Sequence, residues 1–188
     1  MFSRRTTWNE TPNRMAEALA ECRRAGRPLL DLTCANPTLV GLPILDVEVR
    51  AALADPRALR YEPMPLGNAE ARSAVAAYHG NVVPADRVML TASTSEGYAL
   101  LFKLLGDPGD RVLVPVPSYP LFEYLANLEG LTMVPYPCRW EGDGWAIDLS
   151  AVEALIDGRT RAILVVSPNN PTGALLRRSE ADPLLALC

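Results

Sequence analysis

A short segment decides the fold of this chain: AILVVSPNNPTG, residues 162–173. Its first five residues are apolar, as in a strand that is buried on both faces of a parallel sheet. The seven residues that follow contain more than a simple turn needs, since Gly or Asp would be enough to reverse the chain. Pro171 and Gly173 stiffen this loop, and Asn170 offers a side-chain amide that can donate a hydrogen bond. The segment therefore predicts a rigid polar loop at the end of a buried strand.

Short apolar strands and amphipathic helices alternate in the residues around this segment. A Gly-rich, hairpin-like loop surrounds Gly142 and Gly144. The alternation indicates an α/β fold with a parallel sheet and helices on both faces. The expected strands are 88–90, 112–114, 131–134 and 162–166, and the expected helices are 96–105, 121–128 and 151–156.

The first part of the chain has the pattern of a helical arm. A helix is expected from Thr11-Pro12 to Gly26, because a capping hydroxyl followed by proline begins a helix and glycine ends one. We divide the chain into an N-terminal arm and loop segment, residues 1–45, and a larger α/β domain, residues 46–188. The other elements expected here are a strand at 29–32, a loop at 33–43, and helices at 47–54 and 69–79.

Composition excludes several classes of function. The 188 residues are 49% apolar with a net charge of -4, and no basic stripe indicates a nucleic-acid partner. No run of about 18 apolar residues could cross a membrane. The four cysteines form no CxxC pair, so no metal site is expected. Without a secretory signal at the start, we expect a cytoplasmic protein with free thiols.

The loop Ser93-Thr94-Ser95 opens an expected helix. Free backbone N–H groups and the helix dipole favour an anion at such a place, and three small hydroxyl residues add donors without bulk. The same residue types are ordinary helix caps, which is the alternative interpretation. In an open parallel sheet, ligands bind beyond the carboxyl ends of the strands, where this loop and two others are expected to lie.

The second of these loops holds Tyr119 between Pro117 and Pro120. A stiff backbone on both sides would fix the direction of the ring, and a fixed aromatic face suits the stacking of a flat heterocycle. The alternative is a core tyrosine that packs the following helix against the sheet. The third loop is the segment 167–173 described above.

Together these loops resemble the class I/II aminotransferase family, the fold type I enzymes that depend on pyridoxal 5'-phosphate. The family's NPTG string stands here at residues 170–173, and the resemblance runs along nearly the whole chain in order and spacing. The other matching segments are Ser93-Thr94-Ser95 with Asp107-Pro108-Gly109-Asp110 after it, Tyr119, Tyr61-Glu62-Pro63 with Leu66-Gly67, and Asn36-Pro37-Thr38.

The resemblance implies a role for each matching residue. Ser93, Thr94 and Ser95 would hold the cofactor phosphate, Tyr119 would stack on the pyridine ring, and Asn170 would bind the phenolic oxygen of that ring. Tyr61 would reach the cofactor phosphate of the neighbouring subunit in a homodimer. Asn36 would lie over the substrate carboxylate. The implied reaction moves an amino group between an amino acid and a 2-oxo acid.

The resemblance also implies a three-layer large domain, of which residues 46–188 would be the first half, with 1–45 as part of the small domain. The family's Schiff-base lysine, the aspartate at the pyridine nitrogen and a carboxylate-binding arginine all lie beyond NPTG, whereas this chain ends at Cys188. The single lysine, Lys103, is expected on the exposed side of a helix. We therefore expect a fragment that has no catalytic residue of its own and is inactive alone.

Three other interpretations remain. The chain can be a non-catalytic or split half that binds the cofactor or pairs with another chain. It can belong to another fold type I enzyme, such as a lyase or a synthase. An unrelated nucleotide-binding domain is disfavoured, because neither GxGxxG nor GxxxxGK[ST] occurs in the sequence.

Overall fold

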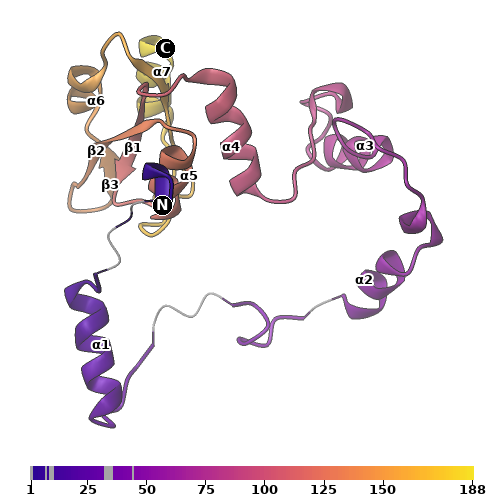
Figure 1. Cartoon of the computed structure of the whole chain (residues 1–188), viewed down its shortest axis with the longest axis horizontal. Coiled ribbons are helices and arrows are strands. Elements are labelled where there is room, and N and C mark those ends of the chain that lie inside the picture. The colour runs from indigo at the N-terminus through magenta and orange to yellow at the C-terminus, as the bar shows by residue number, and fades with distance from the viewer. Residues whose placement is uncertain (1, 7, 9–10, 32–35, 44) are drawn as a thin grey trace. The chain divides into compact units, whose positions relative to one another are not determined.

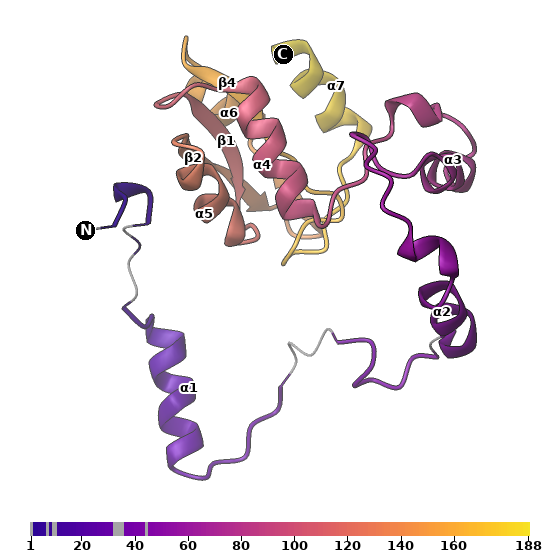
Figure 2. The ribbon, with the colours of Figure 1, turned by 45° about the vertical axis from the view of Figure 1, so that its right-hand side comes forward.

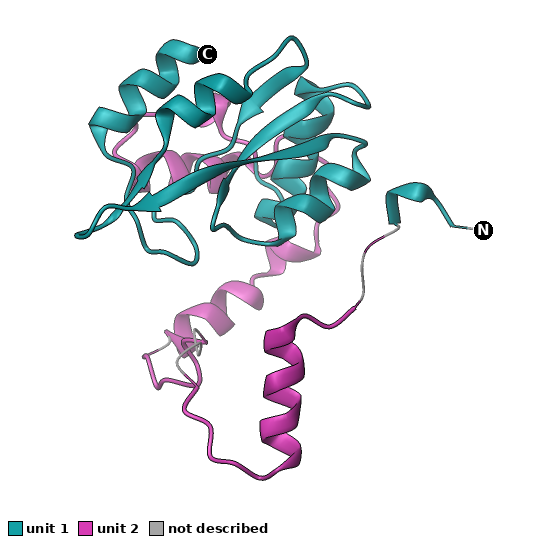
Figure 3. Cartoon of the chain, turned by 90° about the vertical axis from the view of Figure 1, so that its left-hand side faces the viewer, with its two compact units in different colours: residues 1–7, 90–188 teal, residues 8–89 magenta. Residues whose placement is uncertain are grey.

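The computed structural model describes residues 2–6, 8, 11–31, 36–43 and 45–188 (Figure 1). The chain forms two compact units, which are described separately (Figure 3). Unit 1 comprises residues 1–7 and 90–188, and unit 2 comprises residues 8–89. The domain division that we predict at residue 45 follows the family's domains, and it stays a prediction.

Unit 1 is built on a four-stranded sheet with the strand order β3-β2-β1-β4. The central strand β1 pairs in parallel with both β2 and β4, whereas β2 and β3 form an antiparallel hairpin around Gly142 and Gly144. The sequence anticipated this hairpin loop but not β3 itself. The strands are β1 (Arg111–Val116), β2 (Thr132–Trp140), β3 (Trp145–Ile147) and β4 (Thr160–Ile163).

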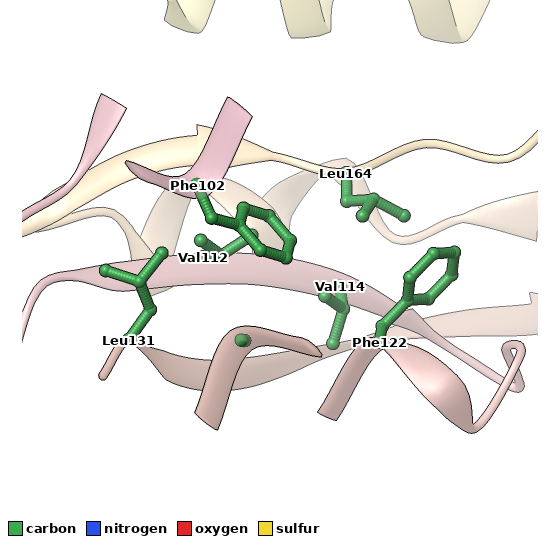
Figure 4. Close-up of a cluster of buried hydrophobic side chains, with 7 residues drawn as sticks. Phe102, Val112, Val114, Phe122, Leu131 and Leu164 are labelled. Atoms are coloured by element: carbon green, nitrogen blue, oxygen red, sulfur yellow. The ribbon is translucent and has the colours of Figure 1, made fainter. Parts of the chain in front are cut away.

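Helices cover both faces of this sheet (Figure 2). Val112 and Val114 of β1 pack into the cluster under α4 (Thr94–Leu105) and α5 (Leu121–Leu128). Figure 4 shows this cluster, which also contains Phe102, Phe122, Ala126, Leu131 and Leu164.

Leu113, between those two valines, points to the opposite face. There it packs with α6 (Leu149–Leu155) and α7 (Arg178–Leu187). Successive side chains of a strand point to opposite faces, so a strand buried on both faces is apolar throughout. The three-layer α/β arrangement expected from the sequence is confirmed, and the cluster on this second face also contains Val134, Tyr136, Val152 and Leu184.

Two expected strands do not form in the described residues. Residues 88–90 and 29–31 have no regular structure, and residue 32 lies outside the described residues, as does part of the expected loop, residues 33–35. A strand exists only through hydrogen bonds to a neighbour, and neither segment has a neighbouring strand in the described part of the chain. β4 ends at Ile163, before the end of its apolar run, although the N–H of Leu164 still donates to the carbonyl oxygen of Leu113 in β1 at 2.8 Å.

The helices of unit 2 are defined mainly by local signals. The expected arm helix begins at Arg14 because the Asn13 side chain accepts the backbone N–H of Ala16, so the start expected at Thr11-Pro12 is wrong by two residues. Asn68 caps the third helix in the same way. The elements are α1 (Arg14–Arg24), α2 (Asp46–Leu53) and α3 (Ala69–Tyr78), with the short 3-10 helices η2 (Pro56–Leu59) and η3 (Ala85–Arg87); a further one, η1 (Arg4–Thr6), belongs to unit 1.

The described helices include none with both the length and the apolar character needed to span a bilayer.

Candidate functional site

A pocket in unit 1 gathers four residues that the sequence analysis singles out. Thr94 and Ser95 come from the first turn of α4, Tyr119 from the loop after β1, and Asn170 from the loop after β4. The remaining lining side chains are apolar or aromatic: Tyr98, Leu121, Phe122, Leu125 and Val166. Residues separated by 76 positions in the sequence, Thr94 and Asn170, thus face one cavity beyond the carboxyl ends of parallel strands, where ligands of such sheets bind.

The polar end of this pocket is the N-terminus of α4. Ser93 caps the helix, because its Oγ accepts the N–H of Glu96 at 3.3 Å. The backbone N–H groups of Thr94 and Ser95 have no acceptor among the described residues, as is usual in a first helical turn. Two open N–H groups and the positive end of the dipole make this end of the pocket suited to an anion.

Glu96 secures this turn from the other side. Its carboxylate accepts the N–H of Ala92 at 2.6 Å, while the hydroxyl of Thr91 donates to the carbonyl oxygen of Ser93 at 2.9 Å. The sequence allows two roles for Ser93, a phosphate ligand or a helix cap. The structure places it as a cap, and its ligand role stays a prediction. The donors of Thr94 and Ser95 are therefore held in a fixed direction.

The flat wall of the pocket is Tyr119. Its side chain is 44% exposed, so the alternative of a buried core tyrosine is wrong. Its ring meets Phe122 edge to face, with centroids 5.9 Å apart and planes at 80°. Phe122 in turn meets Tyr98 at 5.0 Å and 77°. This chain of aromatic contacts fixes the Tyr119 ring while leaving part of it open to a ligand.

The loop after β4 presents Asn170 to the pocket, where it is exposed. Its neighbour Asn169 is buried and organises the loop. The Asn169 amide donates to the carbonyl oxygen of Pro117 at 3.1 Å and to Thr172 Oγ1 at 2.9 Å, and its backbone bonds Gly173 and Ala174. Gly173 has a φ of 72°, a conformation that favours glycine.

Sequence reasoning missed Asn169. A second asparagine directly before the NPTG string was the available signal. Asn169 is 9% exposed, and its Oδ1 is one of two buried side-chain polar atoms in the described residues that have no hydrogen-bond partner. The other is Ser118 Oγ, in the loop that Asn169 contacts. A buried polar group without a hydrogen-bond partner lowers the stability of a fold by about 1–3 kcal/mol. Both loops therefore contain a polar atom that destabilises the fold where it lies.

The other two candidate residues belong to unit 2. Tyr61 is 93% exposed. Asn36 forms a local turn, in which its side-chain oxygen accepts the N–H of Thr38 at 2.9 Å and the Thr38 hydroxyl at 2.6 Å. The roles assigned to Tyr61 and Asn36 stay predictions.

Lys103 lies on α4 with its side chain 60% exposed, and its ammonium donates to the Glu129 carboxylate at 2.7 Å. The expectation of an exposed surface lysine is confirmed. In the parts of the chain that the structure describes, no group of His, Cys, Asp or Glu side chains is arranged to hold a metal ion.

These features define an α/β protein in which one pocket combines a helix end suited to an anion with an aromatic wall. Comparison with known proteins agrees with this description. Residues 30–188 match the family model for aminotransferases of class I and II, and the chain belongs to that family. Members of this family depend on pyridoxal 5'-phosphate, and the structural relatives confirm the fold type I architecture.

The similar proteins are aminotransferases that are named for different amino acids. An alanine aminotransferase of Mycobacterium tuberculosis is 37% identical over 163 residues, which cover 83% of this chain and 37% of that protein. The human tyrosine aminotransferase is 29% identical over 205 residues, covering 100% and 45%. The solved alanine aminotransferase of Pyrococcus furiosus superposes with a TM-score of 0.81 at 28% identity, covering 100% of this chain and 49% of that one. The chain thus spans less than half the length of these relatives.

Proposed function

We propose that the pocket of unit 1 binds pyridoxal 5'-phosphate and that the chain contributes this site to an aminotransferase, which moves an amino group between an amino acid and a 2-oxo acid. The convergence of Thr94, Ser95, Tyr119 and Asn170 on one pocket carries the proposal. The named relatives act on alanine or tyrosine, so the proposal extends only to the class of amino acids.

The residues of the pocket fit the two ends of this cofactor. A phosphate group needs hydrogen-bond donors and a positive potential, which the open N–H groups and hydroxyls of Thr94 and Ser95 supply at the start of α4. A pyridine ring needs a flat apolar surface, which Tyr119 supplies. The exposed amide of Asn170 can donate to a phenolic oxygen. When bound, the cofactor ring withdraws electrons from the substrate, while the protein supplies binding and orientation.

Within this chain we propose that binding is non-covalent. The single lysine is Lys103, whose ammonium is already paired with Glu129 on an exposed surface of α4. This observation favours the second candidate, a cofactor-holding half that works together with further polypeptide. For the assembled enzyme we propose a homodimer in which the exposed Tyr61 serves the partner's cofactor phosphate.

The phosphate end can be tested without altering the rest of the pocket. Proline is tolerated in the first helical position, so Thr94→Pro should keep α4 while removing both the N–H donor and the hydroxyl of Thr94. Thr94→Val keeps that N–H and loses only the hydroxyl. Equilibrium dialysis with pyridoxamine 5'-phosphate, which carries no aldehyde, measures binding by each variant.

We expect the wild-type chain to bind pyridoxamine 5'-phosphate much more tightly than pyridoxamine. Thr94→Pro should weaken binding about tenfold or more, since a hydrogen bond to a charged group contributes about 1.5–3 kcal/mol, and Thr94→Val should weaken it less. Equal affinities for the two ligands, or no effect of Thr94→Pro, would contradict a phosphate site at α4.

Borohydride reduction after addition of pyridoxal 5'-phosphate, followed by peptide mass analysis, tests the non-covalent mode. We expect no label at Lys103 when the aldehyde is stoichiometric with the chain. Stoichiometric label at Lys103 would show that this lysine reaches the cofactor and would overturn the assignment as a surface residue.

A further inference from the structure

One buried side chain joins the two loops that form the ring end of the pocket. The amide nitrogen of Asn169 donates to the carbonyl oxygen of Pro117, 52 positions away in the sequence, at 3.1 Å. The same nitrogen donates to Thr172 Oγ1 at 2.9 Å, which closes the loop on itself. Tyr119 lies two residues beyond Pro117, and Asn170 is the next residue after Asn169. The bond therefore connects the backbone that carries the aromatic wall to the backbone that carries the polar amide.

Asn169 does not itself face the proposed cofactor site. Asn169 lines a second, smaller cavity, together with Thr172, Tyr136 and Glu180. Asn170, one residue further, lines the cofactor pocket instead. Consecutive residues thus line different cavities, and any effect of Asn169 on a ligand in the cofactor pocket must act through the positions of the loops.

The phosphate end is held by different contacts. The first turn of α4 is fixed by Thr91, Ser93 and Glu96, and none of these residues bonds Asn169. Loss of the Asn169 amide should therefore disturb the ring end of the pocket and leave the anion end in place.

We propose that Asn169 is a positioning residue for the cofactor ring, whose amide fixes the placement of Tyr119 relative to Asn170. The inference rests on the proposed function, because it assumes that these two side chains hold the same ring. A ring clasped between two separate loops binds well only when both loops keep their spacing, since displacements of about 1 Å are enough to misplace a bound group. The burial of a polar amide with an unpaired oxygen supports a role beyond packing.

The test compares two ligands that share the phosphate and differ in the ring. Asn169→Leu has a similar size and no donor. Thr172→Val removes the second acceptor of the Asn169 amide together with the acceptor of the Ala174 N–H, and Thr172→Ser keeps both. Asn127→Leu, at a half-buried position of α5, is a control of the same chemical change. Affinities for pyridoxamine 5'-phosphate and for inorganic phosphate are measured on the full chain, together with hydrogen exchange of the Val116, Ser118 and Tyr119 amides.

For Asn169→Leu we expect affinity for pyridoxamine 5'-phosphate to fall about tenfold or more, while phosphate affinity stays within about twofold. Thr172→Val should show a smaller loss in the same direction, and Thr172→Ser and Asn127→Leu should resemble the wild type. The three amides should exchange faster in Asn169→Leu only. A purely structural role would weaken both ligands in parallel, and that result, like an unchanged affinity for pyridoxamine 5'-phosphate, would overturn the proposal.

The two proposals can fail separately. If the wild-type chain binds neither ligand, the cofactor site is wrong, and the exchange data then decide on Asn169 alone. Faster exchange at Val116, Ser118 and Tyr119 in Asn169→Leu would preserve the coupling of the two loops. Unchanged exchange would overturn it.

Discussion

Residues 90–188 bury apolar side chains on both faces of a sheet, whereas Ala76 is the only buried residue among those described in unit 2. Unit 1 draws its order from contacts between distant segments, such as β1 with β2 and β4. The α-helices of unit 2 have eight to eleven residues and mostly exposed side chains. Helices of that length are marginal without a packed face.

This difference in packing indicates which unit can hold a ligand site. A ligand site needs side chains held in place by their surroundings, and in unit 1 each wall of the pocket is fixed by caps, ring contacts or the Asn169 bond. In unit 2, the described contacts of Tyr61 and Asn36 are local or absent, so their proposed roles depend on further polypeptide that packs against them.

The largest expected effect is a contrast in hydrogen exchange between the units. Backbone amides of β1 and β2 should exchange at least about a hundredfold more slowly than those of α1 and α2, because core strands open only with the whole unit while marginal helices open locally. Mass spectrometry on the intact chain measures this contrast. Similar protection of the α2 and β1 amides from exchange would contradict the account that the helices of unit 2 open locally.

Replacing a leucine by alanine should lower the free energy of unfolding far more in unit 1 than in unit 2. Leu113 is 0% exposed in β1, and Leu113→Ala should lower the free energy of unfolding by about 2–5 kcal/mol. Leu53, in α2, is 78% exposed, and Leu53→Ala should change it by less than about 0.5 kcal/mol. Urea denaturation followed by circular dichroism provides both values, and equal losses would show that the two units share one core.

The two tyrosines proposed as cofactor ligands should respond differently to protein concentration. Tyr119→Ala should weaken binding of pyridoxamine 5'-phosphate about tenfold at every concentration, since a stacked aromatic pair contributes about 0.5–1.5 kcal/mol beyond its buried area. Tyr61→Ala should weaken it only where ultracentrifugation detects dimers. An effect of Tyr61→Ala on the monomer would argue against its role across a subunit interface.

Low pH should lower the stability of unit 1, because it protonates Asp148, the residue that caps α6. Hydrogen bonds from the Ser150 hydroxyl and the Ala151 N–H, with the Arg139 guanidinium, lower the pKa of Asp148 from 3.8 to about 2. A carboxylate with a lowered pKa contributes stability at higher pH, and that contribution is lost as the pH falls from 3.8 towards 2.

Thermal unfolding of Asp148→Asn should consequently show a flatter pH dependence than the wild type in this range. Asp55 of unit 2 also has a pKa lowered to about 2, chiefly by the side-chain hydrogen bond from Arg57. Asp55→Asn should leave the cooperative transition of unit 1 unchanged. An equal effect of both substitutions would link the two units during unfolding.

The helices and turns of unit 1 follow from the sequence, because their signals are local. The bounds of α5 are those expected at 121–128, and Gly142 and Gly144 mark the hairpin. The NPTG string, the hydroxyl loop and Tyr119 lead directly to the pocket residues. The expected strand at 88–90 fails because strand formation depends on a partner, which a local pattern cannot supply.

What the sequence did not indicate is the contact between loops. Asn169 is recognisable only once the loop after β4 lies against Pro117, since no spacing rule connects positions 52 residues apart. The cap formed by Glu96 and Ala92 was missed for a different reason. A glutamate in a first helical turn commonly only complements the helix dipole, whereas the Glu96 carboxylate makes a specific bond to the chain before the helix.

The central claim is that three separated segments of unit 1 form one cofactor site. Hydrogen exchange of the chain with and without pyridoxamine 5'-phosphate, at a concentration where it is monomeric, tests this claim most directly. We predict slower exchange at the first turn of α4, at Ser118 and Tyr119, and at residues 169–173, with no change in α1 or α2. Protection confined to one of these segments, or located mainly in unit 2, would contradict the claim.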